Sequence, residues 1–167
     1  MNIRLATSDD LPAVLALNEE SVHFLSPLSG ARLARLHEQA ALHQVLEDQG
    51  QVLAFLLAFR EGAAYDSVNY QWFAGRYARF LYIDRVVVSR RLQTQGAGSA
   101  LYRHAFAWAA AKEVPWVTCE FDVEPPNPVS ERFHAKFGFA EVGRQLVAGG
   151  MKTVSLQAAR VPEQGTN

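Results

Sequence analysis

The sequence contains one cysteine, Cys119, among 167 residues. A lone cysteine cannot form an internal disulfide, and no Cys/His spacing typical of a metal site is present, so we expect no bound metal. No apolar run reaches the roughly 20 residues that span a bilayer, and the charged stretch MNIRLATSDDLPAV lacks the features of a signal peptide. We therefore expect a cytoplasmic protein that has no membrane partner.

The sequence also lacks an excess of charge of either sign. Sixteen basic and seventeen acidic residues leave a formal charge of −1, so no basic field predicts a nucleic-acid partner. Apolar residues make up 49% and charged residues 20%, as in ordinary globular proteins. The length suits one domain, which we expect over residues 1–160 with a C-terminal tail over 161–167.

Hydrophobic periodicity predicts a mixed order of elements, β-α-α-β-β-β-α-β-α-β-β, and therefore an α+β or α/β fold. Strands are expected at 2–6, 43–48, 51–61, 80–88 and 115–123, with a closing hairpin over 139–161. Helices are expected over 7–25, 29–41, from the glycine stretch to about 112, and over 128–137. Residues 61–79 read as a long aromatic loop, which either shapes a site or packs on the sheet edge or on a partner subunit.

Two glycines one residue apart, Gly96 and Gly98, lie where the strand over 80–88 turns into a helix. Unpaired N–H groups and the positive end of a helix dipole meet at such a turn, and glycine lets an anion approach the backbone. The P-loop and the dinucleotide fingerprint are excluded, because no lysine follows the glycines and Leu101 occupies the third glycine position. The glycines therefore indicate either a phosphate site or a purely conformational turn.

In its context this stretch resembles the pyrophosphate-binding motif of the GNAT superfamily of acyl-CoA N-acyltransferases, [Q/R]-x-x-G-x-[G/A], through Gln93, Gly96 and Gly98. The later segment NPVSERFHAKFGF is similar to the family's downstream helix. With the strand order, the resemblance covers nearly the whole chain, which also looks similar to an uncharacterised bacterial branch of that superfamily. It implies the GNAT fold, a mixed central sheet of about six to seven strands flanked by about four helices.

The resemblance implies direct attack of an amine on the thioester of acetyl-CoA, with no metal. It assigns cofactor contacts to the strand, to the glycine turn and to the downstream helix. These residues are Val86, Val87, Val88, Gln93, Thr94, Gln95, Gly96, Ala97, Gly98, Ser99, Asn127 and Phe133.

The catalytic candidates are one histidine and two carboxylates. Where the family most often has a tyrosine that protonates the leaving thiolate, this sequence has His134, which either donates that proton or lines the channel. The attacking amine must lose a proton, and Asp122 is the first candidate base, Glu120 the second and Asp84 the third. Phe133 and Phe137 are expected to face the core, with His134 at the edge of the cleft.

The acceptor is predicted less directly. Phe24, Tyr70, Trp72 and Phe73, with Asp84, either line a pocket for an amine or contribute to a homodimer contact. The favoured function is N-acetylation of a small-molecule amine. The alternatives are N-acetylation of a protein or peptide, and a non-catalytic acyl-CoA sensor.

Overall fold

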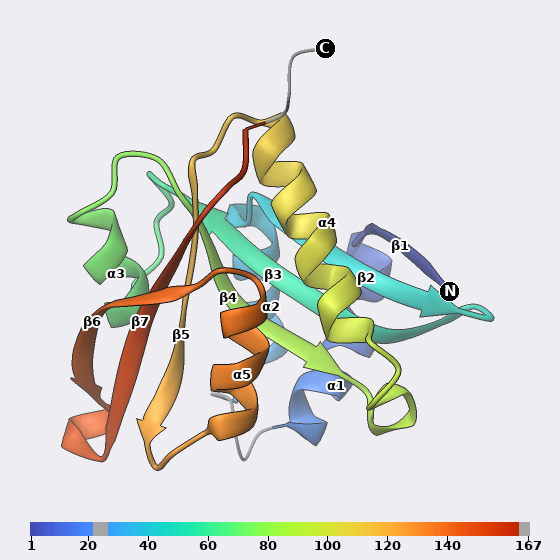
Figure 1. Ribbon diagram of the computed structural model, residues 1–167. Coiled ribbons are helices and arrows are strands. Elements are labelled where there is room, and N and C mark those ends of the chain that lie inside the picture. Colours follow the sequence, from blue (N-terminus) through green and yellow to red (C-terminus); the bar gives the residue numbers. More distant parts are fainter. Residues whose placement is uncertain (22–26, 164–167) are drawn as a thin grey trace. The chain divides into compact units, whose positions relative to one another are not determined.

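The computed structural model describes residues 1–21 and 27–163, shown in Figure 1. Its strands are β1 (Asn2–Leu5), β2 (Leu42–Asp48), β3 (Gln51–Arg60), β4 (Leu81–Val88), β5 (Trp116–Glu124), β6 (Ala140–Val147) and β7 (Lys152–Arg160). Its α-helices are α1 (Leu11–Glu20), α2 (Gly30–Gln39), α3 (Val68–Ala74), α4 (Ala97–Ala111) and α5 (Pro128–Lys136). Short 3₁₀ turns are η1 (Ser8–Asp10), η2 (Arg90–Leu92) and η3 (Ala148–Gly150).

The strands form one seven-stranded mixed sheet in the order β1-β2-β3-β4-β5-β7-β6. The pairs β1/β2, β2/β3, β5/β7 and β6/β7 are antiparallel, whereas β4 pairs with β5 in parallel. The predicted mixed sheet of six to seven strands is confirmed, and with it the α+β fold class.

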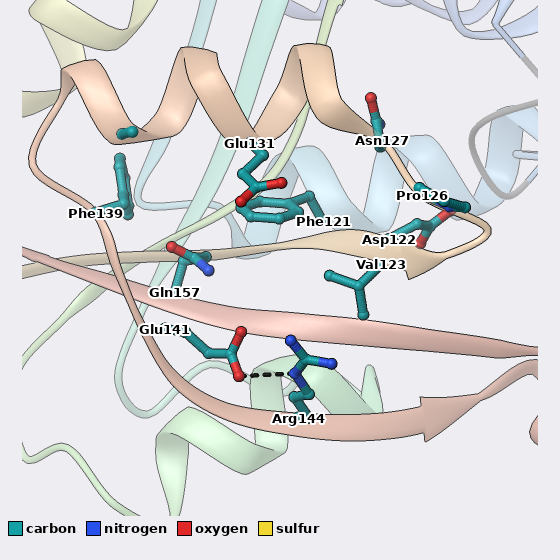
Figure 2. Close-up of a pocket in the computed structure, with 11 residues that line it drawn as sticks. Phe121, Asp122, Val123, Pro126, Asn127, Glu131, Phe139, Glu141, Arg144 and Gln157 are labelled. Atoms are coloured by element: carbon teal, nitrogen blue, oxygen red, sulfur yellow. Dashed lines mark hydrogen bonds and ion pairs between the residues drawn. The ribbon is translucent and has the colours of Figure 1, made fainter.

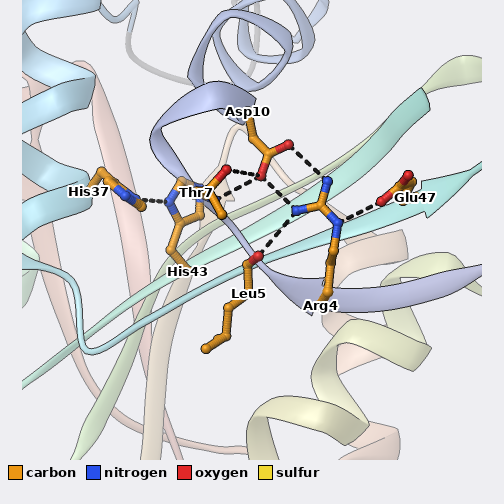
Figure 3. Close-up of polar contacts among 7 residues, drawn as sticks. All are labelled: Arg4, Leu5, Thr7, Asp10, His37, His43 and Glu47. Atoms are coloured by element: carbon orange, nitrogen blue, oxygen red, sulfur yellow. Dashed lines mark hydrogen bonds and ion pairs between the residues drawn. The ribbon is translucent and has the colours of Figure 1, made fainter. Parts of the chain in front are cut away.

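The chain divides into two compact units that alternate along the sequence, Met1–Phe59 with Ile83–Ala107 and Arg60–Tyr82 with Trp108–Asn167. In the first unit a polar network joins β1, β2 and η1 (Figure 3). Arg4 donates to both carboxylate oxygens of Asp10, at 2.7 and 2.9 Å, and to Glu47 at 2.6 Å. These bonds lower the pKa of Asp10 to about 2, because the guanidinium and the Thr7 N–H favour the ionised carboxylate.

In the second unit, α3 and α5 cover opposite faces of β5 (Figure 1). Phe73 of α3 packs against Tyr82, whose hydroxyl donates to Glu120 of β5. The next residue along β5, Phe121, packs against His134 of α5. Because side chains alternate along a strand, neighbouring residues of β5 meet different helices.

Helix α3 corrects the prediction of an irregular loop over residues 61–79. Ser67 caps this helix, since its side chain accepts a hydrogen bond from the Tyr70 N–H at 3.3 Å. The segment is only seven residues long and lies among glycine and aromatic residues, so its helical period is too short to be recognised in the sequence.

Within residues 1–21 and 27–163, no helix is long and apolar enough to cross a membrane. The same residues contain no group of three or more His, Cys, Asp or Glu side chains that could hold a metal ion.

Candidate functional site

The turn between β4 and α4 holds the contiguous residues that the sequence assigns to cofactor binding. Gln93, Thr94, Gln95 and Gly96 are exposed, and the backbone is left-handed at Thr94 (φ 72°) and at Gly96 (φ 74°). A Cβ on Gly96 would meet no atom within 4 Å, so the space beside this backbone is open. The positive φ explains the need for glycine, and the open space leaves the main chain accessible to a ligand.

The first turn of α4 provides the donors. The hydrogen bond from the Ala100 N–H to the Gly96 carbonyl, at 3.0 Å, opens the helix. The N–H groups of Ala97, Gly98 and Ser99 precede it and have no acceptor within the helix. They lie at the positive end of a 15-residue helix, an arrangement that suits an anion.

Strand β4 leads through η2 into this turn. Val87 is buried, whereas Val86 and Val88 are half-buried. Asp84, on the same strand, forms an ion pair with Arg85 at 2.7 Å, and both side chains are more than nine-tenths buried. Arg85 also donates to Asn18 at 3.0 Å, so the Asp84 carboxylate belongs to a buried polar network of the first unit.

Helix α5 begins at Asn127, whose side-chain oxygen accepts the Ser130 N–H at 3.3 Å. The face that α5 buries differs from the prediction. His134 is the buried residue of this helix, at 7% exposure, and Phe133 and Phe137 are only half-buried. The helical period shows which residues share a face, but it does not show which face the neighbouring strands cover.

The contacts of His134 determine its tautomer. Its Nδ1 lies 2.7 Å from the backbone carbonyl oxygen of Ser130. A carbonyl can only accept, so Nδ1 carries the proton and Nε2 carries the lone pair in the neutral ring. Burial among the rings of Phe121, Phe133 and Phe139 lowers the pKa of His134, so this neutral form predominates at pH 7.

The two candidate bases on β5 have different surroundings. Glu120 accepts a hydrogen bond of 2.7 Å from the Tyr82 hydroxyl. Asp122 forms an ion pair of 3.5 Å with Lys152 and lines a pocket. The register of β5 against β7 is regular from Glu120 to Asp122 and shifts only between Asp122 and Glu124, so both candidate bases precede the bulge.

That pocket is a cavity of about 430 Å³ in the second unit, bounded by α5, β5, β6, β7 and the turn before α5 (Figure 2). It brings together the predicted Asp122 and Asn127 with residues that the sequence analysis did not identify. The added polar residues are Glu131, Glu141, Arg144 and Gln157. They lie on three elements that only tertiary packing brings together, so no local motif marks them.

A chain of hydrogen bonds crosses from β6 to β7 along one side of this pocket. Arg144 Nε donates to Glu141 Oε1 at 2.8 Å, and Ser155 Oγ donates to Glu141 Oε2 at 2.8 Å. Gln157 Nε2 then donates to Ser155 Oγ at 2.6 Å. Arg144 and Ser155 lower the pKa of Glu141, which keeps this carboxylate ionised.

The aromatic residues assigned to the acceptor are mostly packed in the interior. Tyr70 and Phe73 are 1% and 0% exposed, and the Tyr70 hydroxyl donates to the Arg60 carbonyl at 2.8 Å. Trp72 is half-buried between Arg76, 4.0 Å above its ring, and the backbone of Gly143. Phe24 lies outside the described residues.

The model of the Acetyltransferase (GNAT) family matches residues 11–139. Ard1 from Thermoplasma volcanium superposes with a TM-score of 0.76 at 18% identity, covering 97% of this chain and 98% of that one. The ribosomal-protein-S18-alanine N-acetyltransferase from Escherichia coli gives 0.73 at 19%, covering 99% and 97%.

A provisionally named phosphinothricin N-acetyltransferase gives a TM-score of 0.73 at 20% identity, covering 97% of this chain and 99% of that one. At these identities the likenesses show a shared fold. No curated protein matches the sequence.

Proposed function

The chain belongs to the acetyltransferase (GNAT) family of acyltransferase enzymes, and from this premise we propose that it transfers an acetyl group from acetyl-CoA to a primary amine of a small molecule. The observation that carries the choice of acceptor is the cavity of about 430 Å³ lined by Asp122 and Asn127. Its volume falls in the range of small-molecule pockets, roughly 300–1,000 Å³.

The residues of the first unit fit the diphosphate of coenzyme A. The exposed backbone of Gln93 to Gly96, the open space beside Gly96 and the N–H groups at the start of α4 together form an anion cradle. The backbone N–H and C=O groups of Val86, Val87 and Val88 in β4 are proposed to form hydrogen bonds with the pantetheine arm of coenzyme A. Asn127 and Phe133, which the resemblance assigns to the cofactor, remain proposed contacts.

When bound, acetyl-CoA supplies an acyl group activated as a thioester, and the protein supplies placement and proton transfer. As the amine nitrogen forms its bond to the carbonyl carbon and the C–S bond breaks, one proton leaves the amine and one reaches the thiolate. Asp122, with Glu120 and Asp84 as the weaker candidates, is proposed to take the amine proton, directly or through water.

His134 is proposed to handle the second proton. In its neutral form Nε2 bears the lone pair, so the ring must first accept a proton from solvent water, which replaces the one that the amine gives to the base, before it can donate one to the thiolate. This order of events makes His134 a relay rather than a resting acid. It differs from a tyrosine at this position, which carries its proton in the resting state.

The second candidate function is N-acetylation of a protein or peptide, which one observation favours. The Escherichia coli protein that shares the fold is named for acetylating an alanine of ribosomal protein S18. The sensor alternative predicts coenzyme A binding without acceptor-dependent thiol release.

The experiment that tests the proposal is thiol release from acetyl-CoA with a panel of small primary amines and of short peptides. The proposed function predicts release that depends on a small amine, with a kcat/KM higher than for any peptide. Release only with peptides would favour the protein acetyltransferase. Tight binding of coenzyme A without release from any acceptor would favour the sensor.

A further inference from the structure

The pocket of the second unit is lined by more carboxylates than cationic side chains. It is lined by three carboxylates, Asp122, Glu131 and Glu141, and by one guanidinium, Arg144. Lys152 offsets the charge of Asp122, and Arg144 offsets that of Glu141. The Glu131 carboxylate is exposed and forms no ion pair or hydrogen bond with any described residue, although its charge also acts on Arg144.

The hydrogen-bond chain through Ser155 determines which end of the Gln157 amide faces the pocket. Ser155 has a single hydroxyl proton, and an ionised Glu141 carboxylate can only accept it. Ser155 Oγ must therefore accept from Gln157, which places the amide nitrogen toward Ser155 and the amide oxygen away from it. The donor-to-acceptor direction of these two hydrogen bonds therefore fixes the orientation of the Gln157 amide.

Gln157 is only 6% exposed, yet its amide oxygen has no hydrogen-bond partner among the described residues and is not sealed from the pocket. Figure 2 shows Gln157 pointing from β7 toward α5 and Glu131 pointing from α5 toward the strands. The rings of Phe121 and Phe139 line the same space. An amide oxygen, a carboxylate and aromatic rings are the groups that bind an ammonium ion.

We infer that this pocket holds a cationic head of the acceptor, an alkylammonium group distinct from the amine that is acetylated, at Glu131 and the amide oxygen of Gln157. The inference rests on the proposed function and names its substrate class, an amine that carries a second positive charge. The ammonium protons are donated to the Gln157 oxygen and to the Glu131 carboxylate. A free diamine and a lysine-containing peptide share this chemistry.

The test compares 1,4-diaminobutane with 4-amino-1-butanol as acceptors, which differ only in the second ammonium. We expect kcat/KM to be about tenfold higher for the diamine, because a hydrogen bond to a charged group is stronger than one to a neutral group. Glu131→Gln and Gln157→Met should each remove most of this preference and change kcat/KM for the amino alcohol less than twofold. Glu163→Gln, which removes the same charge outside the pocket, is the matched control and should preserve the preference.

A second pair of acceptors identifies the source of the head. A peptide with lysine at its second position is compared with the same peptide carrying norleucine there. A preference for lysine that Glu131→Gln abolishes assigns the head to a peptide. A preference confined to the diamine assigns it to a small molecule.

Calorimetric titration of the protein with 1,4-diaminobutane alone separates this inference from the proposed function. Binding that Glu131→Gln weakens, without thiol release from any acceptor, would support the cation site and contradict the acetyltransferase proposal. Equal kcat/KM for the diamine and the amino alcohol, with no effect of Glu131→Gln, would overturn the inference and leave the proposed function intact. Because Glu131 is exposed, its substitution leaves the fold in place and the result interpretable.

Discussion

The Nδ1 atoms of His37 and His43 lie 2.8 Å apart, so one imidazole must donate its proton to the lone pair of the other (Figure 3). The pair cannot hold this contact with both rings charged. His43 is also buried, and its Nε2 has no partner among the described residues. Burial, with the neighbouring His37, lowers the pKa of His43 to about 4, although the Asp10 carboxylate acts in the opposite direction.

This contact predicts a pH-dependent stability. As the pH falls from 6.5 toward 4, the unfolded chain binds a proton at His43 that the folded chain excludes, so folding is disfavoured across this window. From pH 7 to pH 5 the loss is about 2 kcal/mol. Urea unfolding should show it for the wild type and show much less for His43→Leu, whereas His104→Gln, an exposed control, should follow the wild type. A His43→Leu variant with the wild-type slope would contradict the assignment.

Gly143 provides a test of packing in the second unit. A Cβ at this position would lie 2.5 Å from Trp72 Cζ2, and the stiff indole also packs against Phe73. Gly143→Ala is therefore expected to destabilise the fold by about 1–3 kcal/mol. Gly30→Ala, where a Cβ meets nothing within 4 Å, is the control for thermal unfolding.

The clash also predicts a coupling between the two residues. In a double-mutant cycle, Trp72→Leu should recover part of the loss caused by Gly143→Ala, because the smaller side chain leaves room for the new methyl group. Strict additivity of the two substitutions would show that the indole does not occupy this space.

Gly96 tests the turn that precedes α4. Its φ of 74° is unfavourable for any residue with a Cβ, and Gly50, in the hairpin of β2 and β3, has nearly the same φ of 77° and the same open surroundings. Gly96→Ala and Gly50→Ala should each cost about 1–2 kcal/mol of stability. Only Gly96→Ala should weaken the binding of coenzyme A in calorimetry, by about tenfold. An equal effect of both variants on affinity would assign the loss to general destabilisation.

His134 tests the proton relay through the pH profile of kcat. The neutral ring is the active form, and its pKa is lowered by burial, so activity should rise with pH with a midpoint below the ordinary histidine pKa of 6.5. His134→Asn should lower the plateau by about 10²–10³ and remove this acidic limb. Activity that declines as the pH rises above 6 would indicate a histidine that acts as a resting acid instead.

Much of the fold could be predicted from local patterns. The strand β3, apolar on both faces, and the glycine turn before α4 follow from the spacing of a few residues. The burial of His134 could not be predicted, because an amphipathic helix shows its periodicity without showing its partner. The bulge between Asp122 and Glu124 depends likewise on the pairing of β5 with β7, which a single strand does not encode.

The pocket residues, too, could be predicted only in part from the sequence. Asp122 and Asn127 could be predicted from the resemblance to the family, since they lie in one continuous segment of the sequence. Glu131 and Gln157 contribute to the pocket only because α5 packs over the hairpin of β6 and β7. Neither the residue types of Glu131 and Gln157 nor their spacing along the sequence indicates that they line one pocket.

The most direct test of the proposed cofactor site is a calorimetric titration with coenzyme A, pantetheine and inorganic pyrophosphate. If the main-chain N–H groups at the start of α4 hold the diphosphate, coenzyme A should bind at least about 100-fold more tightly than pantetheine, since several charge-assisted hydrogen bonds are lost with the phosphates. Inorganic pyrophosphate should then compete with coenzyme A. Equal affinity for pantetheine and coenzyme A, or the absence of coenzyme A binding, would contradict the account.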